Sequence, residues 1–255
     1  MHLVNYSGTE FDLALNRIVR ILSADEVLAL GIPSPKDLMM VAFASENSIS
    51  NAGTEPWTKE TGLLSVWILG MFNPAPETTI VIPFKPGSVE EFGPAVNDTY
   101  FGKVPADRLI VKDGVLFFRG DGNYRSKIGI SPRRVKPFAG SYDAAKKVLT
   151  VVHLTVPEGA TDYVNSMWEI QQNPFGGDVV NSYNDGPASP GAKPLGPFYE
   201  LESSSPAAAL NSGETLTHIH TTIHLQGNDG ADLDEIARAI FGVGIEEIEN
   251  AFKNP

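Results

Sequence analysis

Residues 198–202 read Phe-Tyr-Glu-Leu-Glu, and residues 217–224 read Thr-His-Ile-His-Thr-Thr-Ile-His. Successive side chains of a strand point to opposite faces, so Glu200 and Glu202 share one face of the first stretch. The same alternation places the three histidines of the second stretch on one face and its isoleucines on the other. Both stretches therefore predict β-strands with one titratable face and one apolar face.

Short runs of apolar and β-branched residues continue along the rest of the chain. A period-two pattern over residues 11–21 predicts a half-buried strand. The dipeptide Asp113-Gly114 separates two apolar runs and predicts a hairpin turn. Residues 184–197, rich in turn formers, are predicted to form a long loop. The other predicted strands cover residues 38–44, 63–71, 78–84, 109–111, 115–119, 148–156, 163–171, 179–183, 198–201 and 216–225.

Helical signals occur in two places. Residues 23–26 match a capping box, which predicts a short helix that ends near residues 31–33. Asp232 is predicted to cap a helix over residues 233–241, and a second amphipathic segment covers residues 245–252.

The composition suits a sandwich of strands. The chain of 255 residues is 42% hydrophobic and contains 24 Gly and 19 Pro, as expected of many short strands joined by tight turns. We expect an all-β (mainly β) fold, a large antiparallel β-sandwich with a short C-terminal helical tail at about residues 232–253. Sandwiches of this length commonly form one domain, so residues 1–255 are predicted to be a single domain.

Charge and composition exclude several classes of function. The net charge of -12 argues against a nucleic-acid or anionic-membrane surface and favours a neutral ligand. The chain has no Cys, so disulfides and thiolate zinc sites are excluded. No segment reaches transmembrane length. No serine-hydrolase fingerprint occurs, and because no P-loop or dinucleotide fingerprint occurs either, no cofactor is expected. The compartment is left open, periplasmic or extracellular if a leader was removed and cytoplasmic otherwise, and so is the oligomeric state.

The carboxylates and histidines are the first candidates for catalysis. If their strands lie close together, Glu200, Glu202, His218 and His220 form one wall suited to proton transfer, and these are the predicted catalytic residues. The alternative is that they are solvated, inert residues on an open sheet face. Glu202 with the two histidines could also offer metal ligands, but the spacing matches no metal motif, so no metal is predicted.

A second group could bind a sugar. Trp168, Asn181, Tyr183 and Asp185 mix aromatic, amide and carboxylate groups, which stack on the apolar face of a sugar and hydrogen-bond its hydroxyls. The alternative is that the polar members only form turns and that the aromatic members fill the core.

Two further segments complete the predicted substrate-binding set. Asn47 lies in the Asn-rich stretch 46–51, which follows a predicted strand and could equally cap a turn. Arg125 belongs to a basic group that could bind a uronate or a phosphate, or could be a solvated face. That group comprises Arg125, Lys127, Arg133, Arg134 and Lys136.

Three motifs give the chain a family resemblance. Residues 67–72, 97–103 and 181–187 resemble an uncharacterised bacterial family of the galactose mutarotase-like superfamily, which includes aldose 1-epimerases. The resemblance implies a galactose mutarotase-like β-supersandwich over the whole chain.

The resemblance to true mutarotases is narrower. Those enzymes carry a catalytic Glu on a strand, a turn that ends in Pro-Gly-Glu, and a strand with His-Thr-Thr. The similar pieces here are Glu200-Leu201-Glu202, Gly213-Glu214 and His220-Thr221-Thr222. The resemblance implies that Glu202 is the base that takes the anomeric proton, with Glu200 second. Their Asn-His-x-Tyr-Phe-Asn segment has no matching histidine here, so the general acid is left among His218, His220 and His153.

These observations leave three hypotheses. The first is an aldose mutarotase or epimerase that uses a Glu base and a His acid without a cofactor. The second is a non-catalytic carbohydrate-binding or accessory protein, and the third is a polysaccharide lyase or hydrolase. All three predict a small-molecule carbohydrate or oligosaccharide as the partner.

Overall fold

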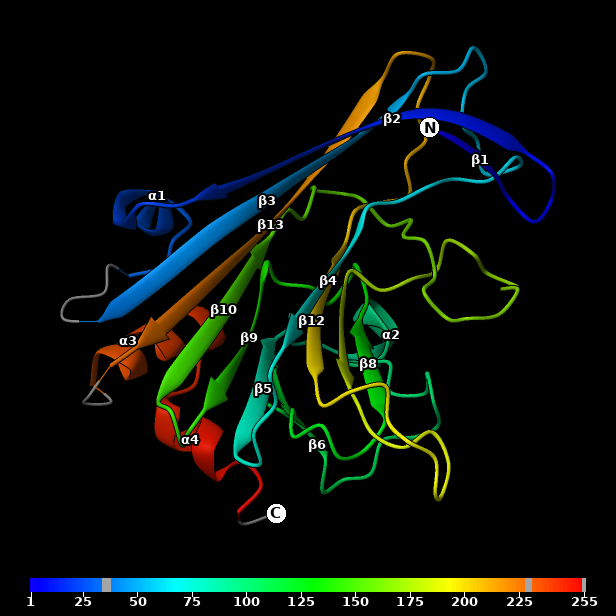
Figure 1. Cartoon of the computed structure of the whole chain (residues 1–255). Coiled ribbons are helices and arrows are strands. Elements are labelled where there is room, and N and C mark those ends of the chain that lie inside the picture. The colour runs from blue at the N-terminus through cyan, green and yellow to red at the C-terminus, as the bar shows by residue number, and fades with distance from the viewer. Residues whose placement is uncertain (34–37, 228–230, 254–255) are drawn as a thin grey trace.

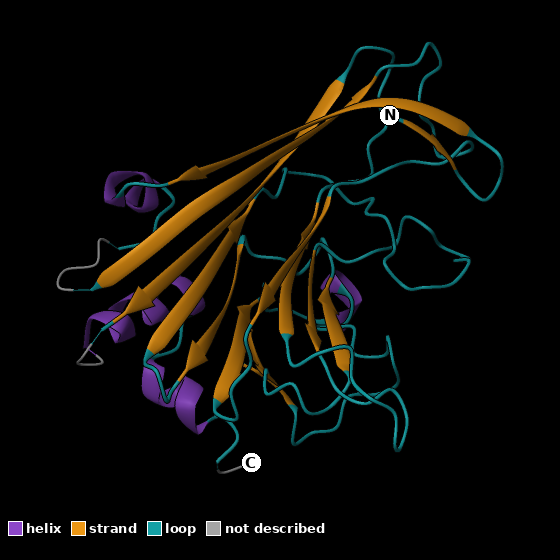
Figure 2. Cartoon of the chain, in the orientation of Figure 1, coloured by secondary structure: helices purple, strands orange, loops and turns teal. Residues whose placement is uncertain are grey.

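The fold is a sandwich of two antiparallel sheets. The computed structural model describes residues 1–33, 38–227 and 231–253. In Figure 1 and Figure 2 the long strands of one sheet run diagonally from lower left to upper right, and the shorter strands of the other sheet stand to their lower right. The large sheet has the order β1 (His2–Val4), β2 (Glu10–Ile21), β3 (Met39–Asn51), β13 (Thr215–Gln226), β10 (Val148–Leu154), β9 (Phe138–Asp143), β5 (Thr78–Pro83), β7 (Val115–Arg119), β6 (Leu109–Lys112). The small sheet has the order β4 (Trp67–Phe72), β12 (Tyr199–Ser204), β11 (Val180–Asn184), β8 (Ser126–Ile130).

Two layers of apolar side chains hold the sandwich together. Between the sheets, Val152 and Leu154 of the large sheet and Ile128 and Leu201 of the small sheet belong to one buried cluster. The opposite face of the large sheet packs on α3 (Ala231–Phe241) and α4 (Ile245–Asn250). The mainly β sandwich with a C-terminal helical tail is thus confirmed, whereas the single-domain assignment stays a prediction.

The helices begin and end close to the predicted positions. The capping box is confirmed at α1 (Ala24–Ala29), where the Ser23 hydroxyl accepts from the backbone amide of Glu26. The prediction that Asp232 caps this helix was wrong, because α3 begins earlier and already includes Asp232 in its first turn. A further short helix, α2 (Val89–Phe92), was not predicted. Within the described ranges, no helix combines the length and apolar character needed to cross a bilayer.

Most predicted strands are confirmed, including the β6–β7 hairpin, in which Asp113 and Gly114 both adopt positive φ. The strand predicted at 163–171 is wrong, because only Tyr163 makes a bridge and no partner strand lies beside the rest. Residues 46–51 do not follow β3 but complete it, paired with β13. Strands β8 and β9 were missed, since glycine and charged residues interrupt their apolar patterns.

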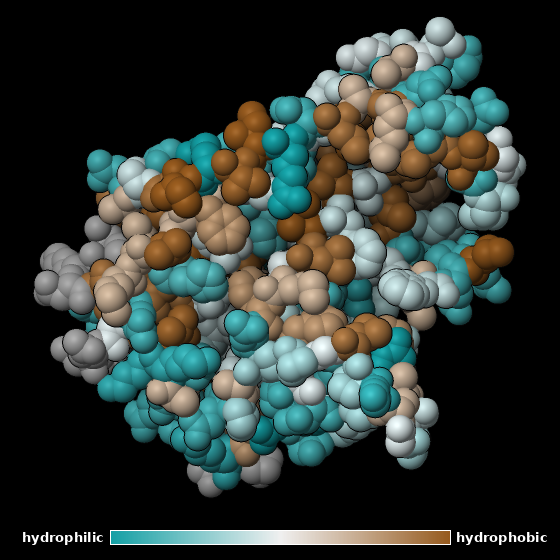
Figure 3. All heavy atoms as spheres, in the orientation of Figure 1, coloured by the Kyte–Doolittle hydropathy of each residue, from teal (hydrophilic) through white to brown (hydrophobic). Residues whose placement is uncertain are grey.

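The second half of β2 differs from the half-buried strand that its pattern predicts. Phe11 and Leu13 are buried, but Leu15, Val19 and Ile21 are 57%, 57% and 74% exposed. Figure 3 shows apolar side chains gathered along this edge of the large sheet. The period-two pattern is correct, but the strand extends beyond the part of the sheet that the small sheet covers.

Arg134 is a buried cation that organises a loop. Its guanidinium donates to the backbone carbonyls of Lys85, Gly87, Ser88 and Gly93. Buried charges require such complete hydrogen bonding, because transfer of an unpartnered charge out of water is very costly. Arg134 therefore fixes the connection that leads from β5 into α2.

We expect Arg134→Lys to lower the free energy of unfolding by about 3 kcal/mol, because a lysine cannot supply the forked set of donors. The measurement is urea denaturation followed by circular dichroism. Arg133→Lys is the control, since the side chain of Arg133, the neighbouring residue, is exposed. Equal stability of the two variants would contradict the structural role of Arg134.

Candidate functional site

The outer face of the small sheet, which no helix of the described residues covers, carries the candidate site. Glu200 and Glu202 project from β12 on this face, while Leu201 between them enters the core. Above Glu200 lies a pocket of about 250 Å3. Its lining comprises Trp67, Leu69, Phe101, Arg125, Lys127, Trp168, Tyr183, Gly186, Ala188, Lys193, Leu195, Phe198 and Glu200.

Glu202 lies beneath the pocket in a fully buried ion pair. Its Oε2 accepts from Lys127 Nζ at 2.9 Å and from Trp67 Nε1 at 2.8 Å. The ammonium of Lys127 also lies 5.0 Å from the centre of the Trp67 ring. Since the Glu202 side chain has no exposed surface, Glu202 supports the pocket from below, whereas Lys127 also belongs to the pocket lining.

Glu200 is the carboxyl group that faces the pocket. Burial, the charge of Glu202 and a hydrogen bond with Glu202 together raise the pKa of Glu200 to about 8. Glu200 is therefore protonated at neutral pH and can donate its proton to Glu202 or to a ligand. The predicted shared face of the two carboxyl groups is confirmed.

Aromatic rings form the walls of the pocket. Trp67, Phe101, Trp168 and Tyr183 contribute to the lining, and the Phe101 and Tyr183 rings meet edge to face at 5.9 Å. The Trp168 side chain belongs to the loop that had been predicted as a strand, and the residue is 89% exposed. Rings of this kind provide flat apolar surfaces for a ligand that also needs hydrogen bonds.

Polar groups below the walls hold them in place. Tyr100 donates to Asp178 at 2.7 Å, and Asn181 donates to the Tyr100 hydroxyl at 2.9 Å. Burial raises the pKa of the Asp178 carboxyl. Tyr183 donates to Asp185, which also accepts from the amide of Gly196. Asn181 and Asp185 thus support the pocket from behind and do not line it.

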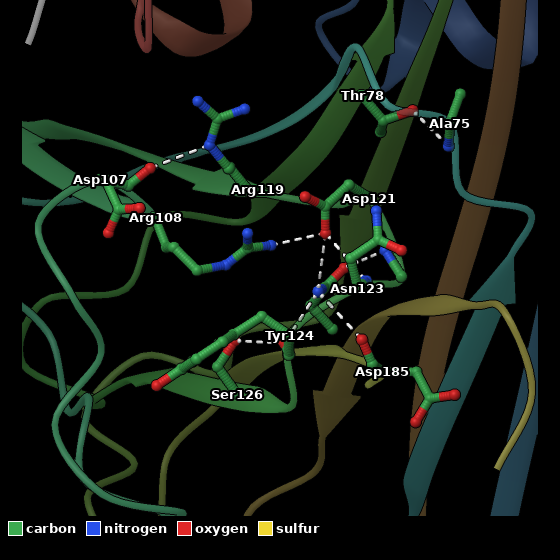
Figure 4. A network of polar contacts seen from close by, with 12 residues as sticks. Ala75, Thr78, Asp107, Arg108, Arg119, Asp121, Asn123, Tyr124, Ser126 and Asp185 are labelled. Atoms are coloured by element: carbon green, nitrogen blue, oxygen red, sulfur yellow. Dashed lines mark hydrogen bonds and ion pairs between the residues drawn. The ribbon is translucent and has the colours of Figure 1, made fainter. Parts of the chain in front are cut away.

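A polar network fixes the segment that leads into β8. In Figure 4, Arg108 and Asp121 point toward one another, and the backbone amide of Asn123 donates to the same carboxylate. A side chain at Gly186 would meet the backbone of residues 124 and 125 at 2.4–2.7 Å, so only glycine allows this approach. The network and the glycine together set the position of Arg125 at the pocket.

The predicted wall of glutamates and histidines is wrong. His218 and His220 face the space between the sheets, where Ser203 Oγ lies 2.8 Å from a nitrogen of each ring. Ser203 follows Glu202, so the alternation of β12 places the histidines and the carboxylates on opposite faces. Burial lowers the pKa of both histidines to about 4, which keeps them neutral. His153 is also remote, beside Phe138 on the helix-covered face of the large sheet.

Asn47 does not reach the site either. Its amide donates to the backbone oxygens of Ser45 and His218 within the large sheet. The predicted basic group is likewise divided, because Arg125 and Lys127 line the pocket while Arg134 is enclosed by carbonyls. Trp67, Phe101 and the role of Lys127 were missed, although the spacing of Arg125 and Lys127 could have indicated a shared face.

A second hollow, of about 440 Å3, lies between the edge strand β4 with β12 of the small sheet and the central strands β9, β10 and β13 of the large sheet. Its polar groups are paired with one another. The Ser141 hydroxyl is 2.7 Å from that of Tyr199, and Thr150 is 3.0 Å from His224. Its one carboxylate, Asp143, is paired with Lys146 at 3.1 Å, so the pocket above Glu200 is the stronger candidate.

In the part of the chain that the structure describes, no three His, Cys, Asp or Glu side chains gather as a metal site requires. No single ion could bind Glu202 together with His218 and His220, because Glu202 points to one side of β12 and the two histidines of β13 lie on the other side.

Comparisons with known proteins give one family and several distant structures. The family model described as "Family of unknown function (DUF6786)" matches residues 1–252. No curated protein matches the chain. A solved structure of a candidate aldose 1-epimerase from Escherichia coli K12 is 12% identical, over 84% of this chain and 68% of that one, with a TM-score of 0.44. The Slr1438 protein from Synechocystis sp. PCC 6803 is 11% identical, over 89% of this chain and 66% of its own, with a TM-score of 0.40.

The pKa of Glu200 predicts a pH dependence of stability. Unfolded Glu200 ionises near 4.5, whereas the folded protein holds this proton up to about 8. The native state then binds more protons, so the free energy of unfolding falls as the pH rises between these two values. The Glu200→Gln variant has no such group, so its free energy of unfolding does not fall in this way. Between these two pH values we expect the variant to gain about 2 kcal/mol in free energy of unfolding relative to wild type, a value reduced for solvent screening.

The measurement is urea denaturation of both proteins at several pH values. Glu214→Gln is the matched control, because Glu214 is exposed in a turn. A constant difference between wild type and Glu200→Gln at all pH values would show that Glu200 has an ordinary pKa.

Proposed function

The chain belongs to the DUF6786 family of unknown function, and we propose that its pocket binds a sugar and exchanges protons at the anomeric centre. The observation that carries this proposal is a protonated carboxyl group, Glu200, at the base of an aromatic pocket. The motif resemblance to aldose 1-epimerases around Glu200 and Glu202 supports the same activity.

The pocket has the chemistry that a sugar requires. A sugar ring presents C–H groups on its faces and hydroxyl groups at its edge, so it stacks on aromatic rings and hydrogen-bonds polar groups. Trp168 and Phe101 offer the rings, while Glu200 and Lys127 offer the polar contacts. Trp168 is largely exposed, so a ligand would cover apolar surface that now faces water.

Glu200 can serve both oxygens of the anomeric centre. Its O–H donates a proton to the ring oxygen while its carbonyl oxygen accepts the proton of the anomeric hydroxyl. The bond between the anomeric carbon and the ring oxygen breaks, a carbonyl forms at that carbon, and Glu200 ends the step protonated again. Rotation and reclosure then give the other anomer. This route needs no histidine, and the pocket lining contains none.

Glu202 is a positioning residue in this proposal. Its ion pair with Lys127 and its hydrogen bond from Trp67 fix a negative charge directly below Glu200. That charge favours the protonated form of Glu200, which the step requires. The sequence-based preference for Glu202 as the base is therefore replaced by Glu200.

A specific observation favours a second function, a carbohydrate-binding protein without activity. Glu200 is the only ionisable acid among the residues that line the pocket, whereas acid and base are usually separate groups. Such a protein would bind the same sugars and leave their anomers unchanged.

The test is exchange spectroscopy by NMR on the anomeric protons of an aldose panel, together with isothermal titration. We expect wild type to accelerate anomer exchange, and Glu200→Gln to reduce the rate at least about 100-fold while affinity changes less than about 3-fold. Glu214→Gln is again the matched control and should retain wild-type rates. Binding without exchange would replace the enzyme by the binding protein, and absence of sugar binding would overturn both.

A further inference from the structure

The charges of the pocket indicate which class of sugar it takes. Resting on the proposed function, we infer that the ligand is a sugar that carries an anionic group, a carboxylate or a phosphate ester, which pairs with Arg125 at the pocket wall.

The pocket is cationic although the protein is strongly acidic. The chain has 31 acidic and 19 basic residues, yet the pocket lining contains Arg125, Lys127 and Lys193 and a single acid, Glu200. Lys127 is neutralised by Glu202 at 2.9 Å. Glu200 is uncharged at neutral pH, because its pKa is about 8. Arg125 and Lys193 therefore contribute uncompensated positive charge to the space that a ligand would fill.

Arg125 is held ready for an anion. Its guanidinium lies 3.8 Å from the centre of the Phe101 ring, so one face is stacked. One donor is used in a hydrogen bond to the Tyr183 hydroxyl, and stacking leaves the other in-plane N–H donors open to carboxylate or phosphate oxygens. Its neighbour on the other side is the Tyr183 hydroxyl, a neutral group. Among the described residues, no carboxylate lies within ion-pair distance of Arg125 or Lys193.

One buried acid near Arg125, Asp185, is already hydrogen-bonded within the protein. Asp185 has no exposed surface, and its two oxygens accept from the Tyr183 hydroxyl at 3.0 Å and from the Gly196 amide at 2.8 Å. It lies behind the Tyr183 ring and does not line the pocket. Its charge lowers the local positive potential but leaves the donors of Arg125 open to a ligand.

A neutral sugar would leave these donors facing water, whereas an anionic sugar would use them. The stacked ring of a uronate or a sugar phosphate can lie against the aromatic wall while its anionic group reaches the guanidinium. Selectivity then comes from charge-assisted hydrogen bonds in a partly desolvated site, which are stronger than neutral ones. This corrects the sequence-based preference for a neutral ligand, which rested on net charge alone.

The test is isothermal titration with galacturonate, glucuronate and glucose 6-phosphate against galactose and glucose. We expect at least one anionic sugar to bind about 10-fold more tightly than its neutral parent, with affinity that falls as salt rises. Arg125→Gln should remove this preference, and Arg125→Lys should retain part of it. Arg133→Gln, an exposed arginine outside the pocket lining, is the matched control.

The outcomes separate this inference from the proposed function. Equal affinity for neutral and anionic sugars, or an unchanged preference in Arg125→Gln, overturns the inference and leaves the proposed function in place. Failure of every sugar to bind overturns both. Preference for uronates over the phosphate, or the reverse, identifies the anionic group.

Discussion

Two carboxyl groups on one face of β12 share a single cation, and the character of the pocket depends on this constraint. Lys127 pairs with Glu202 in a space that excludes water, so the charge of this pair is balanced. A second ionised carboxylate at Glu200 would have no cation within ion-pair distance among the described residues, and burial makes that state costly. Glu200 therefore holds a proton, and its carboxylic acid group faces a pocket lined by cationic and aromatic side chains.

The sandwich enforces this arrangement through strand alternation. Leu201 and Ser203 point inward from β12, where Leu201 fills the core and Ser203 bridges two neutral histidines of β13. The same alternation sends Glu200 and Glu202 outward, where β8 supplies Lys127. The alternation of β12 thus separates a structural polar contact between the sheets from the two carboxyl groups on the pocket side.

Local periodicity could be predicted from the sequence, but the assignment of strands to sheets could not. Alternation correctly placed Glu200 with Glu202 and the three histidines together, and Asp113-Gly114 correctly gave a hairpin. However, β12 and β13 follow one another in the chain yet lie in different sheets, so their titratable faces do not meet as a wall. Lys127 was obscured because β8 is short and contains a glycine, and Trp168 comes from a loop without a partner strand.

The most direct test of this account is the titration of the Glu200 carboxyl by carbon-13 NMR, with its resonance assigned by its loss in Glu200→Gln. The account predicts a midpoint near 8, well above the ordinary value of 4.5. A midpoint close to 4.5 would show that Glu200 is ionised at neutral pH, which would contradict both the charge balance with Lys127 and the proton exchange that depends on it.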